Sequence, residues 1–385
     1  MFLTIITFIL VLSLLVFVHE LGHFWVARRF GLKPKEFGFG FPPRAWGIYK
    51  SKDGKWKKVR GSGEVADAAD TIYSVNWIPM GGFVNIGEDE EASDDPNHFT
   101  NKPIWQRAII LSAGVAMNIV LAAVLIIFGL MIGLPQVIDD IHPRAQIMDK
   151  RIQIVQVLPE TPAAGAGVQL GDIIAGINNN QFTKYEKLQQ FVNEHSGQEL
   201  SYKIKRGQEE IIMLITPVIM EETGKGGIGI AIAETGIVKY PWYLAIQEGI
   251  KTTVFLTWAI VTAFYELFKN LIMGNGVSVE LAGPVGIAAL TGQMARMGFV
   301  YVLQFTALLS INLAIINFLP IPALDGGRVL FLIIEKIRGK SMKRELEAGL
   351  NQVFFILLML LVLIVTFRDV ARYGDKFKMI WERIF

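Results

Sequence analysis

Residues 2–25 read FLTIITFILVLSLLVFVHELGHFW, and this stretch decides what kind of protein the chain is. From Phe2 to Phe17 it carries no charged side chain, and the run to Ala27 is long enough to cross a bilayer, which takes about 20 apolar residues. Ionisable side chains are expensive at membrane depth and are retained mostly where they serve a function. The group His19, Glu20 and His23 therefore indicates a functional site inside a membrane helix.

The composition supports a membrane protein. Of the 385 residues, 52% are hydrophobic and only 19% are charged, whereas globular domains have about 25% charged residues. The 37 basic and 35 acidic residues leave a net charge of +2, which is too balanced to indicate nucleic-acid binding. The chain has no cysteine, which excludes disulfides, thiolate metal ligands and a cysteine nucleophile. Any metal site must use His, Asp or Glu.

Long apolar segments recur along the chain and predict four transmembrane helices. These segments are Phe2–Ala27, Ala108–Leu134, Phe299–Leu319 and Val353–Phe367. A fifth apolar stretch, Tyr243–Met273, is interrupted by charged residues such as Glu248 and Lys251. These charges favour an amphipathic helix or helix pair lying in the membrane interface over a true span.

The charges of the loops predict the orientation. The segment from Arg28 to Arg60 is rich in Lys and Arg and has only Glu36 and Asp53 as acidic residues, and the loop after the third predicted span is also basic. Basic loops stay in the cytoplasm. We therefore expect both termini, and the long section between the second and third spans, to lie on the outer side.

That outer section contains a small mostly-β domain from about Gln153 to Pro217, with short apolar strands and one amphipathic helix at Lys184–His195. It resembles a bacterial PDZ domain, which implies a groove that binds an extended peptide as an added strand. The stretch Gly226–Ala233 is expected to be a closing strand of the same domain. A small β-domain of unrelated fold is the alternative.

The sequence HELGH at residues 19–23 fits the H-E-x-x-H pattern. Histidines at i and i+4 lie on one helical face and both reach one Zn²⁺, and the glutamate between them accepts a proton from water. If Arg28 and Arg29 mark the interface, His19 lies about 13 Å deeper at helical rise. The alternative, a structural histidine bonded to a backbone carbonyl, would have to explain all three polar residues at once.

A catalytic zinc usually has three protein ligands and one open position. Asp325 is the candidate third ligand, within INFLPIPALDGGRVL at the cytoplasmic end of the third predicted span. Pro320 and Pro322 break the helix there, and Gly326–Gly327 are expected to give the chain freedom to turn the carboxylate inward. An aspartate that merely caps the following helix is the alternative.

HELGH and NFLPIPALDGG together resemble the paired signatures of the site-2 protease family of intramembrane zinc metalloproteases. The stretches KEFGFGFPPRAWG, YSVNWIPMGGFVNIGED, SAGVAMNIVLAA and LAGPVGIAALTG extend the resemblance over nearly the whole chain. Two departures are visible. The chain has room for one PDZ domain where some members carry two in tandem, and its second-span motif has Ala-Gly-Val where members often have Ala-Gly-Pro.

The resemblance implies a role for each matching residue. His19, His23 and Asp325 would be zinc ligands, and Glu20 the general base. Asn317 would support the substrate at the active site. Gly81 and Gly82 would form the turn of a membrane-reentrant β-hairpin, built from roughly Thr71–Ile86, that lies beside the substrate.

The expected fold is thus an α-helical membrane protein with four transmembrane helices, a membrane-reentrant β-hairpin and one inserted PDZ-like α/β domain. Residues 1–134 would hold the first two spans and the hairpin loop, and residues 150–235 the PDZ-like domain. Residues 240–275 would form interfacial helices, and residues 276–385 the last two spans with the Leu-Asp-Gly motif.

The expected function is hydrolysis of a peptide bond within a transmembrane segment by a multi-pass protein of the bacterial inner (cytoplasmic) membrane. The partners would be a transmembrane protein or peptide substrate, the lipid bilayer and a peptide bound by the PDZ domain, but no nucleic acid. A helical substrate must unwind before attack, and Thr71–Ile78, ending at Pro79, is predicted to be an edge strand that accepts it.

Two other function classes remain open from the sequence: a non-catalytic PDZ-bearing membrane scaffold or transporter, and a zinc metalloprotease that cleaves peptides at the membrane surface. Within the family, the sequence does not choose between anti-sigma factors and remnant signal peptides as substrates.

Overall fold

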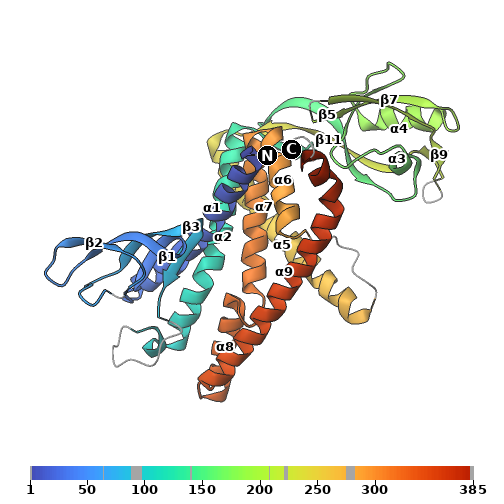
Figure 1. Cartoon of the computed structure of the whole chain (residues 1–385). Coiled ribbons are helices and arrows are strands. Elements are labelled where there is room, and N and C mark those ends of the chain that lie inside the picture. The colour runs from blue at the N-terminus through green and yellow to red at the C-terminus, as the bar shows by residue number, and fades with distance from the viewer. Residues whose placement is uncertain are drawn as a thin grey trace. The chain divides into compact units, whose positions relative to one another are not determined.

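The computed structural model describes residues 2–63, 65–87, 98–138, 141–207, 209–220, 224–274 and 282–381 (Figure 1). The chain divides into two compact units, which are considered separately. The first comprises Met1–Ile126 and Gly249–Phe385, and the second comprises Ile127–Glu248.

Five helices are long and apolar enough to cross a membrane. They are α1 (Phe2–Arg29), α2 (Ile104–Ile132), α5 (Trp242–Met273), α7 (Phe299–Phe318) and α9 (Arg344–Trp381). The stretch predicted to be an interfacial helix or helix pair is one continuous helix, α5, and its mean hydropathy of 1.2 is the lowest of the five. Length and composition alone therefore do not separate α5 from the four predicted spans.

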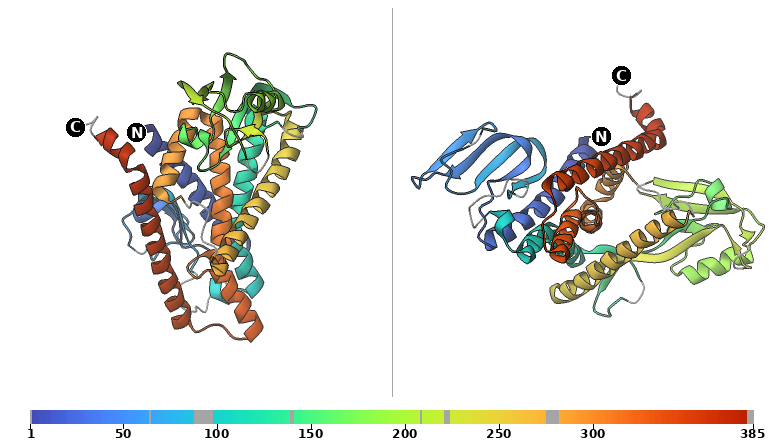
Figure 2. Two further views of the ribbon diagram at one scale, coloured as in Figure 1. Left: turned by 90° about the vertical axis from the view of Figure 1, so that its right-hand side faces the viewer. Right: turned by 90° about the horizontal axis from the view of Figure 1, so that it is seen from below.

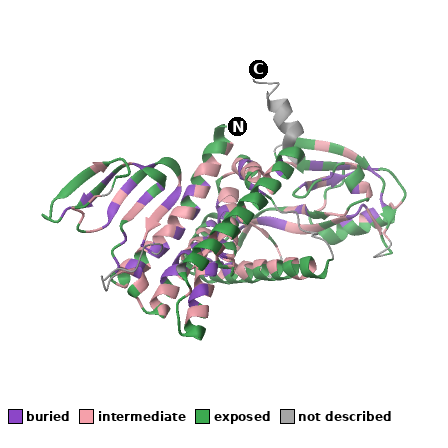
Figure 3. Cartoon of the chain, turned by 60° about the horizontal axis from the view of Figure 1, so that its bottom comes forward, coloured by how far each residue is buried: buried purple, intermediate pink, exposed green. Residues whose placement is uncertain are grey.

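Helix α1 ends where its sequence changes character. No Gly or Pro interrupts it before Gly22, and Gly31, with a φ of 81°, allows the chain to leave the helix. The N–H of Leu32 bonds to the Ala27 carbonyl at 3.0 Å and closes the end. Ala27 and Leu32 then pack in one buried cluster with Ile110, Leu111 and Leu332, which joins α1 to α2 and α8 (Asp325–Arg338). Figure 3 shows buried residues where helices meet and exposed ones on their outer faces.

A three-stranded sheet lies beside α1 (Figure 1 and the right view of Figure 2). Its order is β2-β1-β3, with β1 at Glu36–Lys50, β2 at Trp56–Arg60 and β3 at Ile72–Asn85. Strand β3 bends back on itself, so that Phe37 of β1 has two partners, Tyr73 near the start of β3 and Val84 near its end. The predicted hairpin of Thr71–Ile86 is therefore wrong in one respect: its two arms flank a segment of β1 instead of pairing with each other.

This arrangement also corrects the predicted edge strand. Ser74 and Val75, within the stretch Thr71–Ile78, pair with the first half of β1 on one side and with its second half on the other, so they are internal. The arm from Gly82 to Asn85 has partners only in the first half of β1 among the described residues. The free edge of the sheet is therefore Gly82–Asn85. Alternation alone did not reveal this, because internal and edge strands alternate alike.

Helices α7 and α8 are separated by a short break. Pro320 and Pro322 lack the N–H that would continue α7, and Ala323 turns with a φ of 74°. The predicted role of the two glycines is wrong, because Gly326 and Gly327 lie within α8. They allow close approach instead: a Cβ at Gly326 would lie 2.3 Å from the Phe318 carbonyl oxygen. The remaining elements of this unit are α6 (Pro284–Met297) and the short 3₁₀ helix at Phe99–Asn101.

The second unit is a six-stranded sheet with two short helices. The strand order is β4-β11-β5-β6-β7-β8, and α4 packs Leu188 and Val192 into the core. The expected helix Lys184–His195 is confirmed, with those two residues as its caps. The strands are β4 (Leu134–Val137), β5 (Gln146–Val157), β6 (Ile173–Ile177), β7 (Leu200–Arg206), β8 (Glu209–Ile215) and β11 (Ile230–Lys239), with a separate pair β9 (Val218–Ile219) and β10 (Gly226–Gly227), and the helices are α3 (Pro162–Gly165) and α4 (Tyr185–Glu194).

The core of this domain is apolar and well closed. Ile177, Tyr202 and Ile204 are fully buried in it, and burial raises the pKa of the Tyr202 hydroxyl. At the rim, Arg206 donates two hydrogen bonds to Asp172, at 2.8 and 2.7 Å, and this partner raises the pKa of the guanidinium. Of the expected closing stretch 226–233, residues from Ile230 onward form β11 and pair with β5.

Candidate metal centre

Three side chains from distant parts of the chain converge in the first unit. His19 and His23 lie one turn apart on α1, and Asp325 begins α8. The Nε2 atom of His19 lies 2.9 Å from Oδ2 of Asp325, the Nε2 of His23 lies 3.4 Å from the same oxygen, and the two Nε2 atoms are 3.2 Å apart. The sequence thus predicted all three members of a cluster whose candidate ligand atoms lie within 4.8 Å of one another.

Hydrogen bonds orient the two imidazoles. The Nδ1 of His23 lies 2.8 Å from the carbonyl oxygen of Ile110 on α2, so it donates its proton there. The Nδ1 of His19 lies 3.3 Å from the side-chain nitrogen of Asn118, also on α2. Fixing Nδ1 in this way directs each Nε2 lone pair toward the shared point, as in metal-binding histidines. The histidines themselves are 6% and 5% exposed.

The chemistry of this donor set fits a zinc ion. The Oδ2 of Asp325 is buried and has no hydrogen-bond partner, which is rare for a buried carboxylate oxygen. Two imidazole nitrogens and one carboxylate oxygen pointing at one another repel as lone pairs unless a cation lies between them. Two His and one carboxylate form a ligand set of catalytic zinc sites.

Helix α2 contributes two residues that sequence reasoning did not single out, although both lie in the quoted stretch SAGVAMNIVLAA. A Cβ at Gly114 would lie 2.4 Å from Nε2 of His23 and 2.7 Å from Cε1 of His19, so only glycine lets α2 pass this close. Asn118 is fully buried and contacts His19. A small residue and a polar residue one turn apart in an apolar helix were the available signal.

The other predicted site residues lie around this cluster. Glu20 follows His19 on α1 and is half-buried. The side-chain nitrogen of Asn317, near the end of α7, lies 3.4 Å from Nε2 of His19. Gly82 packs on α1, since a Cβ there would lie 2.9 Å from Cα of Phe17 and 3.4 Å from Cβ of Glu20.

The bend of β3 is fixed to α1 next to the cluster. The hydroxyl of Ser13 donates to the Pro79 carbonyl at 3.2 Å and accepts from the Gly81 N–H at 3.3 Å. Gly81 has a φ of 74° and packs against Val16, where no side chain would fit. The free edge Gly82–Asn85 therefore starts beside the helix turn that carries Glu20.

Ion pairs hold the start of β3 at the cytoplasmic end of α1. Arg28 pairs with Asp70. Burial works to raise the pKa of Asp70, but hydrogen bonds from Arg28 and from the Thr71 N–H outweigh it and lower the pKa.

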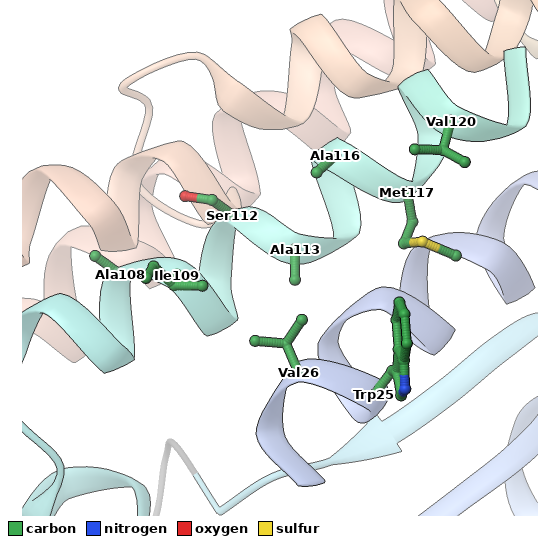
Figure 4. A pocket seen from close by; sticks show the side chains of 9 residues that line it. All are labelled: Trp25, Val26, Ala108, Ile109, Ser112, Ala113, Ala116, Met117 and Val120. Carbon is green, nitrogen blue, oxygen red and sulfur yellow. The ribbon is translucent and has the colours of Figure 1, made fainter. Parts of the chain in front are cut away.

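A groove of about 400 Å³ between α1 and α2 is not part of this site (Figure 4). Trp25 and Val26 of α1 face Ala113 and Met117 of α2 across it, and Ser112 is its only polar lining residue. It offers no set of metal ligands, and a surface of this kind suits lipid chains.

Comparison with known proteins agrees with this geometry. The family model described as peptidase family M50 matches residues 7–59 and 64–361. The chain belongs to this family. The match includes both histidines, Glu20 and Asp325, and the chain is accordingly a zinc metalloprotease.

Relatives match over nearly their full length. The regulator of sigma-W protease RasP of Bacillus subtilis is 30% identical, with 96% of this chain and 98% of the relative covered. A putative zinc metalloprotease of Clostridium perfringens, CPE1693, is 32% identical, with 94% and 97% covered. Among solved structures, the PDZ domain of an SdrC-like protein from Listeria monocytogenes matches 23% of this chain and 92% of its own length, with 22% identity and a TM-score of 0.21.

Proposed function

We propose that this M50 protease cleaves peptide bonds within transmembrane segments, with zinc held by His19, His23 and Asp325. The observation that carries the proposal is the place of the ligand cluster. Two of the three side chains lie in the middle of α1, a helix with a mean hydropathy of 2.7, and the third is brought to the same depth by the break between α7 and α8. A site at that depth meets membrane segments of substrates and not water-soluble peptides at the surface.

Each residue has a role that follows from its position. Bound zinc would activate a water molecule and polarise the scissile carbonyl. Glu20 would take the proton of that water and deliver it to the leaving amine. Asn317, 3.4 Å from Nε2 of His19, would donate a hydrogen bond to the substrate carbonyl at the metal.

The free edge of the sheet gives the substrate a place to unwind. A helical segment must expose its backbone before attack, and unpaired N–H and C=O groups are costly in the bilayer. The edge Gly82–Asn85 would pair with the unwound segment as an added strand. Since Gly82 packs beside Glu20, a strand added there would run past the general base.

The membrane arrangement extends this proposal. We place α1, α2, α7 and α9 across the bacterial inner (cytoplasmic) membrane and α5 in its interface, with the bent strand β3 reaching into the bilayer. Basic residues after α1 and α8 place the zinc toward the cytoplasmic side. The β-rich domain of the second unit would be a PDZ-like domain on the outer side that binds or excludes the outer part of a substrate.

The substrates would be membrane proteins with one accessible helix. The Bacillus relative is named for a sigma-W pathway, and both anti-sigma factors and remnant signal peptides fit the proposed site. The test is a substrate trap: the Glu20→Gln protein, expressed in membranes, should accumulate uncleaved transmembrane peptides that the unaltered protein removes. Accumulation of soluble peptides alone would contradict intramembrane cleavage.

A further inference from the structure

The sheet β2-β1-β3 has two unlike faces, and the uncovered face is the apolar one. Residues 61–70 cover one side, where Arg44 donates to the Gly61 carbonyl at 2.8 Å and Tyr49 to the Asp67 carboxylate at 2.9 Å. The other side leaves large apolar side chains open, which a water-soluble sheet would hide. These are Trp46 at 48%, Ile48 at 37%, Trp56 at 62% and Val75 at 37% exposure.

Two rows of paired residues cross this open face, and each runs from α1 outward. One row is Val84, Phe37, Tyr73, Ile48 and Lys58. The next is Gly82, Phe39, Val75, Trp46 and Arg60. Directly paired residues project to the same face. Each row is therefore apolar along its middle and ends in a cation on β2, which Figure 3 shows as an exposed strand.

The inner ends of both rows touch the membrane helix. The ring of Phe37 stacks on Phe24 with centroids 4.5 Å apart, and Phe39 lies 6.1 Å from Phe17. Phe24 precedes Arg28 by one helical turn, which is about 6 Å along the axis. The open face thus continues the lipid-facing surface of α1 close to the cytoplasmic interface.

The cations on the open face lack partners, whereas the cation on the covered face is neutralised. Lys50, Lys58 and Arg60 are exposed and make no ion pair among the described residues. Lys57, which points to the other face, lies 2.8 Å from the Asp67 carboxylate and 3.7 Å from that of Asp53. Uncompensated cations beside an apolar surface complement a layer of anionic headgroups, and long Lys and Arg side chains reach such a layer from below it.

We propose that the open face of this sheet binds anionic phospholipid of the cytoplasmic leaflet. Trp46 and Ile48 lie among the acyl chains, and Lys58 and Arg60 bind the headgroup phosphates. The same sheet carries the edge Gly82–Asn85 beside Glu20, so anionic lipid would fix the angle at which that edge meets α1. The inference rests on the proposed membrane position of α1 but not on zinc chemistry.

The experiment uses the absence of cysteine from the chain, which makes single labels unambiguous. Ile48→Cys on the open face and Lys57→Cys on the covered face are each made in the full-length Glu20→Gln protein, so that catalysis plays no part. Each protein, with zinc, is placed in nanodiscs of phosphatidylcholine with or without phosphatidylglycerol and labelled with a solvatochromic fluorophore. Brominated acyl chains then report contact with lipid.

We expect brominated lipid to quench the label at position 48 several-fold more than the label at 57, and phosphatidylglycerol to increase quenching at 48. Adding Lys58→Gln and Arg60→Gln should remove most of that increase, because each cation near an anionic surface changes the binding equilibrium about fivefold. The matched control pair, Lys55→Gln and Lys57→Gln, removes the same charge from alternate positions and should leave the increase in place.

Equal quenching at positions 48 and 57 would overturn the proposed lipid contact. Quenching at 48 that ignores phosphatidylglycerol, or that persists unchanged without Lys58 and Arg60, would overturn the headgroup assignment. Cleavage of a transmembrane reporter by the cysteine-free parent protein is measured separately. Its loss would count against the proposed function and leave the lipid result standing.

Discussion

Asn118 on α2 lies 3.3 Å from Nδ1 of His19, and its own Oδ1 has no hydrogen-bond partner although the residue is fully buried. A histidine that binds zinc through Nε2 carries its proton on Nδ1 and must donate it. A half-turn of the Asn118 carboxamide brings Oδ1 to that proton and satisfies both groups. Asn118 is thus a positioning residue that fixes the tautomer of His19.

We expect Asn118→Ala to weaken zinc binding by about 10- to 100-fold, the usual effect of removing such a partner. Asn118→Asp, which keeps an acceptor for Nδ1–H, should retain most of the affinity. Zinc dissociation constants would be measured on purified protein by competition with a chelator. Asn312→Ala is the control, since that side chain only bonds to the Leu308 carbonyl of its own helix; an equal loss in both alanine variants would contradict the assignment.

Removing the third ligand should remove the metal. Asp325→Ala leaves two imidazoles, and we expect purified protein to lose most of its zinc by elemental analysis. Asp369→Asn is a matched control, because Asp369 is a buried membrane-helix aspartate that accepts from the Gly286 N–H at 2.7 Å, away from the cluster. Full zinc content in the Asp325 variant would exclude it as a ligand.

Glu20→Gln should separate metal binding from catalysis. The substitution removes the proton acceptor but no ligand, so zinc content should stay near that of the unaltered protein. Cleavage of a transmembrane reporter should fall by at least about 100-fold, the scale of general acid–base catalysis. A reporter cleaved at nearly the original rate by this variant would rule Glu20 out as the base.

The contact between the sheet edge and α1 should control cleavage without affecting the metal. A methyl group at Gly82 would lie 2.9 Å from Cα of Phe17, so Gly82→Ala must shift the edge away from Glu20. We expect reporter cleavage to fall at least tenfold while zinc content is kept. Gly63→Ala is the control on the same sheet, since nothing lies within 4 Å of the added atom. Unchanged cleavage in Gly82→Ala would argue against substrate pairing at this edge.

The domain of the second unit is expected to govern access and not chemistry. The Tyr240 N–H bonds to the Leu130 carbonyl at 2.9 Å, so residues 134–239 can be replaced by a short Gly/Ser linker. The shortened protein should still cleave a reporter whose outer part is truncated, and should discriminate less against one whose outer domain is intact. Loss of both activities in a folded, zinc-loaded protein would make the domain part of the catalytic machinery.

The sequence by itself determined the membrane class and three of the site's chemical groups. Helical periodicity places His19 and His23 on one face whatever surrounds them, and the apolar run before them sets their depth. Asp325 was found because the prolines and its place before a basic loop matched that depth. These are local properties, since they depend on spacing along a single segment.

Only the tertiary structure decided which residues complete the site. Gly114 and Asn118 act through distances to α1, and an apolar helix gives no sign of which of its faces meets a given neighbour. The free edge moved from Thr71–Ile78 to Gly82–Asn85 because strand neighbours depend on register between separate segments, and alternation is the same for internal and edge strands. Packing and register, which no local pattern encodes, therefore set the environment in which the ligands work.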